Sequence, residues 1–180
     1  MKSKLTYNIS LIAFFTTLLV ISSWFTIPFV IPFTLQTLVI FIFIQVLDLK
    51  KSVVILLIYF LLGIIGIPVF NSFQSGLVVF IGPTGGFLIG FIPMIIVSKL
   101  LTLNKSNKTS KSKNLSTFIS LFIGLVCCYV ISVLWYILIY DTSTNVLSAF
   151  SILVLPFIIP DIIKIIISIM IVKRFNVLSK

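Results

Sequence analysis

The stretch Leu155-Pro156-Phe157-Ile158-Ile159-Pro160-Asp161-Ile162-Ile163-Lys164 places an acid and a base inside a long apolar run. If the backbone is helical from Pro160 onward, positions i and i+3 share one face, so Asp161 and Lys164 can point at the same place. A charged side chain at membrane depth costs about 2.5–3.5 kcal/mol on insertion scales, and such residues usually mark a substrate or ion path. We therefore expect this pair to be the centre of a small-molecule site. The alternative is an ion pair that only helps the segment to insert.

The rest of the composition predicts a membrane protein with several spans. Of the 180 residues, 60% are hydrophobic and only 9% are charged, more apolar surface than a soluble core can bury. Because a spanning helix needs about 20 apolar residues, we expect an all-α membrane protein with six transmembrane helices in one bundle, forming a single integral membrane domain over residues 1–180. The predicted spans are residues 5–26, 33–47, 52–67, 84–103, 115–140 and 146–172. Since Pro156 and Pro160 interrupt the last span, its regular helix should begin near Pro160, with Asp161 in the first turn.

The basic residues orient these spans. Twelve of the 13 Lys and Arg residues fall on one side of the six-span arrangement, many of them in a Lys-rich linker at residues 104–114, and only Lys164 is expected within a span. The loops 28–32, 68–83 and 141–145 on the other side contain no Lys or Arg. By the positive-inside rule, both termini and the linker are cytoplasmic. A site at Asp161 and Lys164 should therefore open outward.

Several classes of function lack the residues that they need. The chain has no His, and its only acids are Asp48, Asp141 and Asp161, so we expect no metal site, no paired-carboxylate or Ser/His/Asp catalysis, and hence no enzyme. The net charge of +10 resides at span ends and does not predict nucleic-acid binding. No Lys follows the glycine-rich run at residues 82–90, so the chain has no phosphate loop.

Two further patterns are candidates for binding surfaces. Gly82, Gly86 and Gly90 recur every four residues, which allows close approach of another helix or of a flat ligand. Nearby aromatic side chains and one amide have the usual make-up of a small-molecule pocket; these residues are Phe70, Asn71, Phe73 and Phe87. Along the first helix, a stripe of small residues predicts docking to another protein or packing within the bundle; its members are Thr6, Ser10, Ala13 and Thr17.

Four segments together resemble the signature stretches of the BioY family, the biotin-binding substrate components (S components) of prokaryotic energy-coupling-factor transporters. They follow the chain in order from the second span to the last: Pro32-Phe33-Thr34-Leu35-Gln36-Thr37, Gly66-Ile67-Pro68-Val69-Phe70, Gly82-Pro83-Thr84-Gly85-Gly86-Phe87-Leu88-Ile89-Gly90-Phe91, and Pro156-Phe157-Ile158-Ile159-Pro160-Asp161-Ile162-Ile163-Lys164. The resemblance implies a six-helix bundle in the prokaryotic plasma membrane that holds biotin near its outer face. It also implies a transmembrane coupling subunit and two cytoplasmic ATPase subunits as partners, with no cofactor bound by this chain.

The resemblance also assigns residues. The D-x-x-K pair of the family's site falls on Asp161 and Lys164. The small-residue face that contacts the coupling subunit falls on Ala13 and, imperfectly, on Thr17, and Ser10 lies beside it. The chain departs from the family's pattern in three places: Asp48-Leu49-Lys50-Lys51 replaces a Gly-Pro turn, Pro160 replaces a Gly, and Thr17 replaces an Ala.

For biotin, we expect Lys164 either to pair with the ligand carboxylate or to stay paired with Asp161 and order it. Asp161 and Asn71 would hydrogen-bond the ureido ring, since unpaired buried polar atoms cost about 1–3 kcal/mol each. The apolar ring and chain would be enclosed by Phe70, Phe87 and the Gly85-Gly86 backbone. Three alternatives are open: an S component for another vitamin, a solitary biotin carrier, and a docking subunit that binds no ligand.

Overall fold

The structure, a computed structural model, describes residues 2–27, 33–103 and 110–178. The predicted turn at residues 28–32 and residues 104–109 of the predicted linker lie outside the described residues. The described chain is almost entirely helical, and its elements follow in this order: α1 (Lys2–Trp24), β1 (Thr26–Ile27), β2 (Phe33–Thr34), α2 (Gln36–Val46), α3 (Leu49–Ile64), η1 (Asn71–Phe73), α4 (Val78–Ile81), α5 (Gly85–Leu103), α6 (Ser110–Trp135), η2 (Tyr136–Tyr140), α7 (Val146–Leu153) and α8 (Leu155–Leu178).

Among the described residues, four helices are long and apolar enough to cross a membrane, which confirms an all-α membrane protein. Their apolar segments are Leu5–Trp24, Gly85–Thr102, Lys113–Tyr140 and Leu155–Phe175. The predicted spans 33–47 and 52–67 are helical over α2 and α3, which have 11 and 16 residues. At 1.5 Å per residue they rise roughly 17 and 24 Å, less than the hydrocarbon core of about 30 Å.

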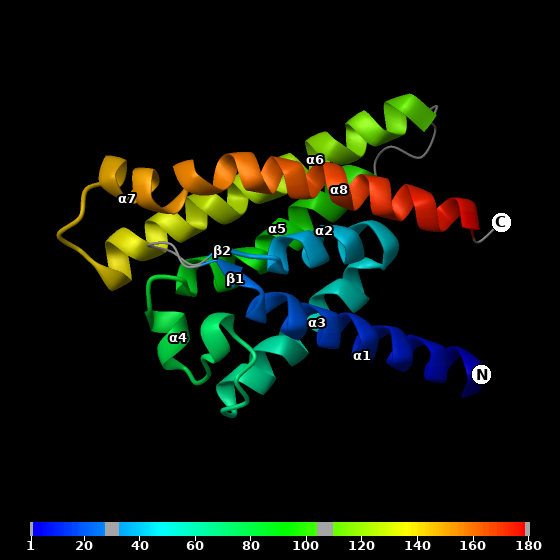
Figure 1. Ribbon diagram of the computed structural model, residues 1–180, viewed down its shortest axis with the longest axis horizontal. Coiled ribbons are helices and arrows are strands. Elements are labelled where there is room, and N and C mark those ends of the chain that lie inside the picture. The colour runs from blue at the N-terminus through cyan, green and yellow to red at the C-terminus, as the bar shows by residue number, and fades with distance from the viewer. Residues whose placement is uncertain (1, 28–32, 104–109, 179–180) are drawn as a thin grey trace.

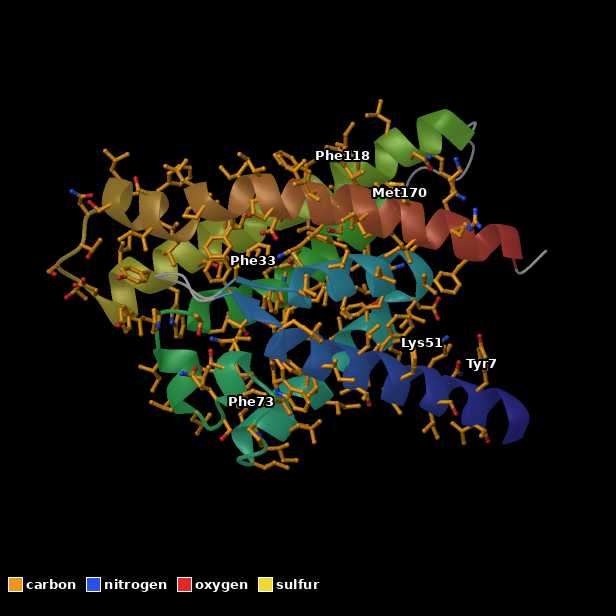
Figure 2. The ribbon with its side chains drawn as sticks, in the orientation of Figure 1. Tyr7, Phe33, Lys51, Phe73, Phe118 and Met170 are labelled. Carbon is orange, nitrogen blue, oxygen red and sulfur yellow. The ribbon has the colours of Figure 1, made fainter. Side chains whose placement is uncertain are left out.

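The helices pack lengthwise around one apolar core. α5 packs along α6, and α8 packs on both α2 and α6, while α1 lies against α2 and α3. Figure 1 shows that α1 begins and α8 ends at the same end of the molecule, and that α4 and α7 lie at the opposite end. Lys51 and Tyr7 lie toward the first of these ends (Figure 2). Lys51 and the short helices α4 and α7 thus lie toward opposite ends of the long axis.

The last helix begins earlier than the sequence indicated. α7 ends at Leu153, the backbone breaks at Val154, and α8 already starts at Leu155, with Pro160 inside it. Pro156 fits because the first helical turn needs no backbone N–H donors of its own. The expectation of a start near Pro160, with Asp161 in the first turn, was wrong. Asp161 lies in the second turn, so its charge has to be met by side chains instead of by free backbone N–H groups.

Lys99 is a second correction. Lys164 was expected to be the only basic residue within a span, but Lys99 also lies inside α5 and is buried, with 8% of its surface exposed. It lies about one turn before the end of the helix at Leu103. The long aliphatic stem of a lysine can be buried near a span end while the ammonium extends toward the end of the helix.

The regularly spaced glycines let α5 approach α6 closely. A Cβ atom added at Gly86 would lie 2.7 Å from Ser132 Cα and 2.8 Å from Trp135 Cβ, and one added at Gly90 would lie 2.8 Å from Cys128 Sγ. Gly82 differs, because it lies in the turn before α5 and a Cβ there would meet carbonyl oxygens only at an ordinary 3.5 Å. The helix-packing alternative is therefore confirmed for Gly86 and Gly90, and the stripe does not include Gly82.

We predict that Gly86→Ala destabilises the protein by about 1–3 kcal/mol, because the added methyl group overpacks the contact between α5 and α6. The thermal unfolding midpoint of the purified protein in detergent measures this loss. Gly82→Ala is the matched control and should leave the midpoint nearly unchanged. Equal midpoints for Gly86→Ala and the unmodified protein would contradict this account of the packing.

Candidate ligand-binding site

One cavity is formed where segments that are distant in the sequence meet. Its empty volume, including the part that is open to solvent, is about 540 Å³. The polar side chains that line it come from β2, α2, η1, the turn before α5, α6 and α8; they are Thr34, Gln36, Thr37, Asn71, Thr84, Tyr129, Asp161 and Lys164. Apolar walls are formed by Phe87, Phe91, Leu125, Cys128 and Phe157. A few polar groups on an apolar wall are the usual make-up of a ligand site.

The predicted acid–base pair is formed and buried in this cavity. Lys164 Nζ lies 2.8 Å from Asp161 Oδ1, and the two residues are 5% and 3% exposed. Thr37 connects them, because its hydroxyl donates to Asp161 Oδ1 at 3.0 Å and accepts from Lys164 Nζ at 2.8 Å. The i, i+3 spacing on α8 therefore has the predicted result, and α2 supplies a hydroxyl that bridges both charges.

The Lys164 ammonium has a protein partner for each of its three hydrogens. It donates to Asp161 Oδ1, to Thr37 Oγ1 and to the Thr34 carbonyl oxygen, each at 2.8 Å. It also lies 3.9 Å from the centroid of the Phe33 ring, a cation–π distance. Phe33 itself is half-buried and stacks on Phe157 of α8, with the ring centroids 6.1 Å apart. Since an ammonium has no further donor, this arrangement favours a lysine that fixes the carboxylate of Asp161.

The Asp161 carboxylate keeps capacity for a ligand. Its Oδ1 accepts from Thr37 and Lys164, and its Oδ2 accepts from the Tyr129 hydroxyl at 2.7 Å. A carboxylate has about four lone-pair positions, and three are used. Donors from α2, α6 and α8 thus fix the carboxylate, which can accept one more hydrogen bond from a ligand in the cavity.

Asn71 supplies an amide on another wall of the cavity. Its side chain is buried, with the residue 8% exposed, and within the described ranges it makes no side-chain hydrogen bond. Buried amides usually have partners, so this one is available to a ligand. The two following residues, Ser72 and Phe73, have φ angles of 55° and 60°, which are uncommon for residues other than glycine. Strain of this kind is concentrated at functional sites.

The structure brings together only some of the predicted site residues. Asp161, Lys164, Asn71 and Phe87 line the cavity, and the Phe87 ring lies 5.8 Å from that of Phe157. The other three predicted residues, Phe70, Gly85 and Gly86, do not line it.

Phe70 is fully buried in an aromatic cluster with Tyr59 and Phe80, and its ring fills the space beside Gly63. Gly85 faces the backbone of Phe80, and Gly86 faces α6. The structure therefore gives these three residues packing roles and does not place them on the cavity wall.

No role was predicted from the sequence for the polar residues of β2, α2 and α6 that line the cavity. Thr34, Gln36 and Thr37 lie in a quoted motif, yet no role was assigned to them. Their signal was a cluster of three polar side chains at the start of an apolar segment. Tyr129 gives no comparable signal, because it is a single tyrosine within a long apolar helix. Its role depends on the contact with Asp161, which only the fold reveals.

The small-residue stripe of α1 faces away from the bundle. Ser10, Ala13 and Thr17 are all exposed, and the Thr17 hydroxyl donates to the Ala13 carbonyl oxygen at 2.9 Å within the helix. Packing against the protein's own helices is therefore excluded for these three residues. The face is open to a partner or to lipid.

Comparisons with known proteins identify the family of this chain and agree with its fold. The sequence model of the BioY family matches residues 1–180. The chain belongs to the BioY family. It is 34% identical to the biotin transporter BioY of Thermotoga maritima, over 92% of this chain and 93% of that protein. It is also 34% identical to the biotin transporter BioY2 of Lactococcus lactis subsp. cremoris, over 91% and 87% of the two chains.

The fold matches a solved structure as well. The crystal structure of the S-component for biotin from an ECF-type ABC transporter superposes with a TM-score of 0.83 at 21% identity, covering 98% of this chain and 94% of that one. At this identity the likeness supports the fold only.

We predict that Thr37→Val destabilises the ligand-free protein by about 1–3 kcal/mol, because it removes a hydrogen-bond partner from both Asp161 and Lys164 in a buried site. Thr117→Val is a matched control, since the Thr117 hydroxyl only donates to the Lys113 carbonyl oxygen on the surface of α6. Thermal unfolding in detergent should separate the two variants. Equal unfolding midpoints would show that the bridging hydroxyl contributes little.

Proposed function

We propose that this protein captures biotin and takes it up as the S component of an energy-coupling-factor transporter. The observation that carries the proposal is the buried Asp161 carboxylate, which Lys164, Thr37 and Tyr129 hold at the wall of a cavity that also contains the unpaired amide of Asn71. Membership of the BioY family and the biotin transporters among its relatives support biotin as the ligand. This is a transport family, and we propose no catalytic role, metal or cofactor for the chain.

The contacts favour one of the two binding modes for biotin. Because the three Lys164 hydrogens are already used, we propose that the lysine stays paired and that Asp161 accepts an N–H group of the ureido ring. The Asn71 amide can donate to the ureido oxygen and accept from the other N–H group. The rings of Phe87, Phe91 and Phe157 then cover the apolar part of the ligand. Few polar groups and aromatic walls together give selectivity for a molecule with one polar and one apolar portion.

The proposed topology is a single integral membrane domain over residues 1–180 in the plasma membrane of a prokaryotic cell, with six membrane segments. Two of them, α2 and α3, are short, with 11 and 16 residues. The basic residues near the start of α3 and the end of α8 support cytoplasmic termini, since Lys50, Lys173 and Arg174 are exposed there. The cavity would then open to the outside, because it lies near the starts of α2 and α5.

A transmembrane coupling subunit is the proposed partner of the exposed face of α1 at Ser10, Ala13 and Thr17, and two cytoplasmic ATPase subunits would power uptake. Small residues at this spacing let a second helix approach closely in the membrane. Transport by a solitary carrier would need no such contact.

Biotin titration by calorimetry tests the ligand site. We expect saturable one-to-one binding to the purified protein, and at least about tenfold weaker binding for Asp161→Asn and for Lys164→Ala, because each leaves a buried charge without its partner. Asp48 and Lys51 provide a control with the same spacing, since they form a partly exposed i, i+3 ion pair at 3.0 Å. Asp48→Asn and Lys51→Ala should bind like the unmodified protein.

Other outcomes of the titration have definite meanings. Unchanged affinity in both α8 variants would contradict the site. If folded protein gives no heat with biotin, another vitamin becomes the candidate ligand. A subunit that only docks to other proteins would give no heat with any vitamin.

Co-purification with the coupling subunit tests the proposed partner. We expect Ala13→Leu to lose the partner while keeping full biotin affinity, because the larger side chain blocks close helix approach on a face that is remote from the cavity. Ser151→Leu on the exposed surface of α7 is the control for adding an apolar side chain. Full uptake by Ala13→Leu without partner subunits would support the solitary carrier.

A further inference from the structure

The two polar walls of the proposed site, Asp161 on α8 and Asn71 on η1, come from distant parts of the chain. A series of hydrogen bonds, partly buried at Thr34 and buried at Gln36 and Tyr59, runs from the Asp161–Lys164 pair to the Val69 carbonyl oxygen, two residues before Asn71. None of Thr34, Gln36 and Tyr59 has a role in the binding mode described above.

The first part of the series links the acid–base pair to α2. Lys164 Nζ donates to the Thr34 carbonyl oxygen at 2.8 Å. The Thr34 hydroxyl in turn donates to Gln36 Oε1 at 3.0 Å, and the Gln36 backbone N–H lies 3.4 Å from the same hydroxyl oxygen. The Gln36 side chain is therefore fixed from the side of the charged pair.

The second part links α2 to the segment that precedes Asn71. Gln36 Nε2 donates to the Tyr59 hydroxyl, and the Tyr59 hydroxyl donates to the Val69 carbonyl oxygen at 3.0 Å. Tyr59 is fully buried and Gln36 is 5% exposed. Val69 is two residues before Asn71, so this bond anchors the backbone from which the site amide extends.

The end of α1 holds the same backbone. The Ser23 hydroxyl also donates to the Val69 carbonyl oxygen, and Trp24 Nε1 donates to the Pro68 carbonyl oxygen at 2.9 Å. By contrast, the Asn71 side chain has no hydrogen bond within the described ranges, and the left-handed φ angles of Ser72 and Phe73 follow directly. The position of the Asn71 amide therefore depends on how its backbone is anchored.

We propose that Gln36 and Tyr59 are positioning residues, which set the location of the Asn71 amide relative to the Asp161 carboxylate. The inference rests on the proposed function, since it takes Asp161 and Asn71 to be ligand contacts. Tyr59 does not line the cavity, so it acts on the ligand through the groups that its hydroxyl holds, the Val69 backbone before Asn71 and the Gln36 side chain. Gln36 connects this anchor to the charged pair, so that the two walls are held at one separation. Fully paired polar networks of this kind rigidify a buried site.

The competing explanation is that Tyr59 is only a core residue whose hydroxyl happens to be satisfied. Its ring packs edge-on against Phe70 at 5.4 Å, so loss of the ring would disturb the core. Tyr59→Phe avoids this, because it keeps the ring and removes only the hydroxyl group with its hydrogen bonds. Tyr7→Phe on the exposed surface of α1 is the matched control.

A double-mutant cycle on biotin affinity separates the two explanations. We expect Tyr59→Phe to weaken binding about tenfold, as loss of one well-placed polar contact does. In an Asn71→Ala background, the same substitution should change affinity by less than about twofold, because the amide that it positions is absent. An equal loss in both backgrounds would overturn the proposal, as would unchanged affinity in Tyr59→Phe alone.

Hydrogen exchange of the ligand-free protein provides a test that does not need biotin. We expect Tyr59→Phe to raise amide exchange in residues 68–74 and to leave exchange around Asp161 on α8 unchanged. Unaltered exchange in residues 68–74 would overturn the anchoring role. If the unmodified protein binds no biotin but the exchange result holds, the proposed function fails while the anchoring stands.

Discussion

The arrangement around the Asp161 carboxylate is the constraint on which the rest of the site depends. A carboxylate at 3% exposure inside an apolar bundle is costly unless it is paired and hydrogen-bonded. Here Lys164 supplies the opposite charge, and Thr37 and Tyr129 supply hydroxyl donors from two other helices. The helices α2, α6 and α8 must therefore meet at this depth, and breaking a buried pair of this kind costs about 3–5 kcal/mol. The same contacts that satisfy the charge also orient it toward the cavity.

The start of the second helix contributes to this arrangement. α2 has 11 residues and begins at Gln36, directly after β2. Its start lies beside α8, so that the Thr34 carbonyl oxygen and the Thr37 hydroxyl both reach Lys164. The close approach of α5 to α6 at Gly86 and Gly90 brings Phe87 and Tyr129 to the same cavity, where their rings lie 6.4 Å apart. Glycines that pack against neighbouring backbone and residues that line the cavity thus follow one another along α5. This explains why Gly85 and Gly86, next to Phe87, were predicted to contact the ligand.

The sequence predicted those features that depend on local spacing. Asp161 and Lys164 were expected to share a face because they are three residues apart, and an all-α membrane protein followed from the length of the apolar segments. Contacts between distant segments could not be predicted in this way. Tyr129 looks like any tyrosine in an apolar helix, and Phe70 looks like a pocket residue until Gly63 and Phe80 are seen around it. The start of α8 was misplaced because two prolines were both taken as breaks, whereas Pro156 lies in the first turn, where a proline is tolerated.

The most direct test of the central claim is an experimental structure of the protein with biotin bound. Our account predicts the ureido ring within hydrogen-bond distance of both the Asp161 carboxylate and the Asn71 amide, with the Lys164 ammonium still paired to Asp161. It would be contradicted by a ligand whose carboxylate replaces Asp161 as the partner of Lys164. It would equally be contradicted by biotin bound in the apolar groove that α6 forms with α7 and α8, where Val130, Phe150 and Ile158 form part of the wall.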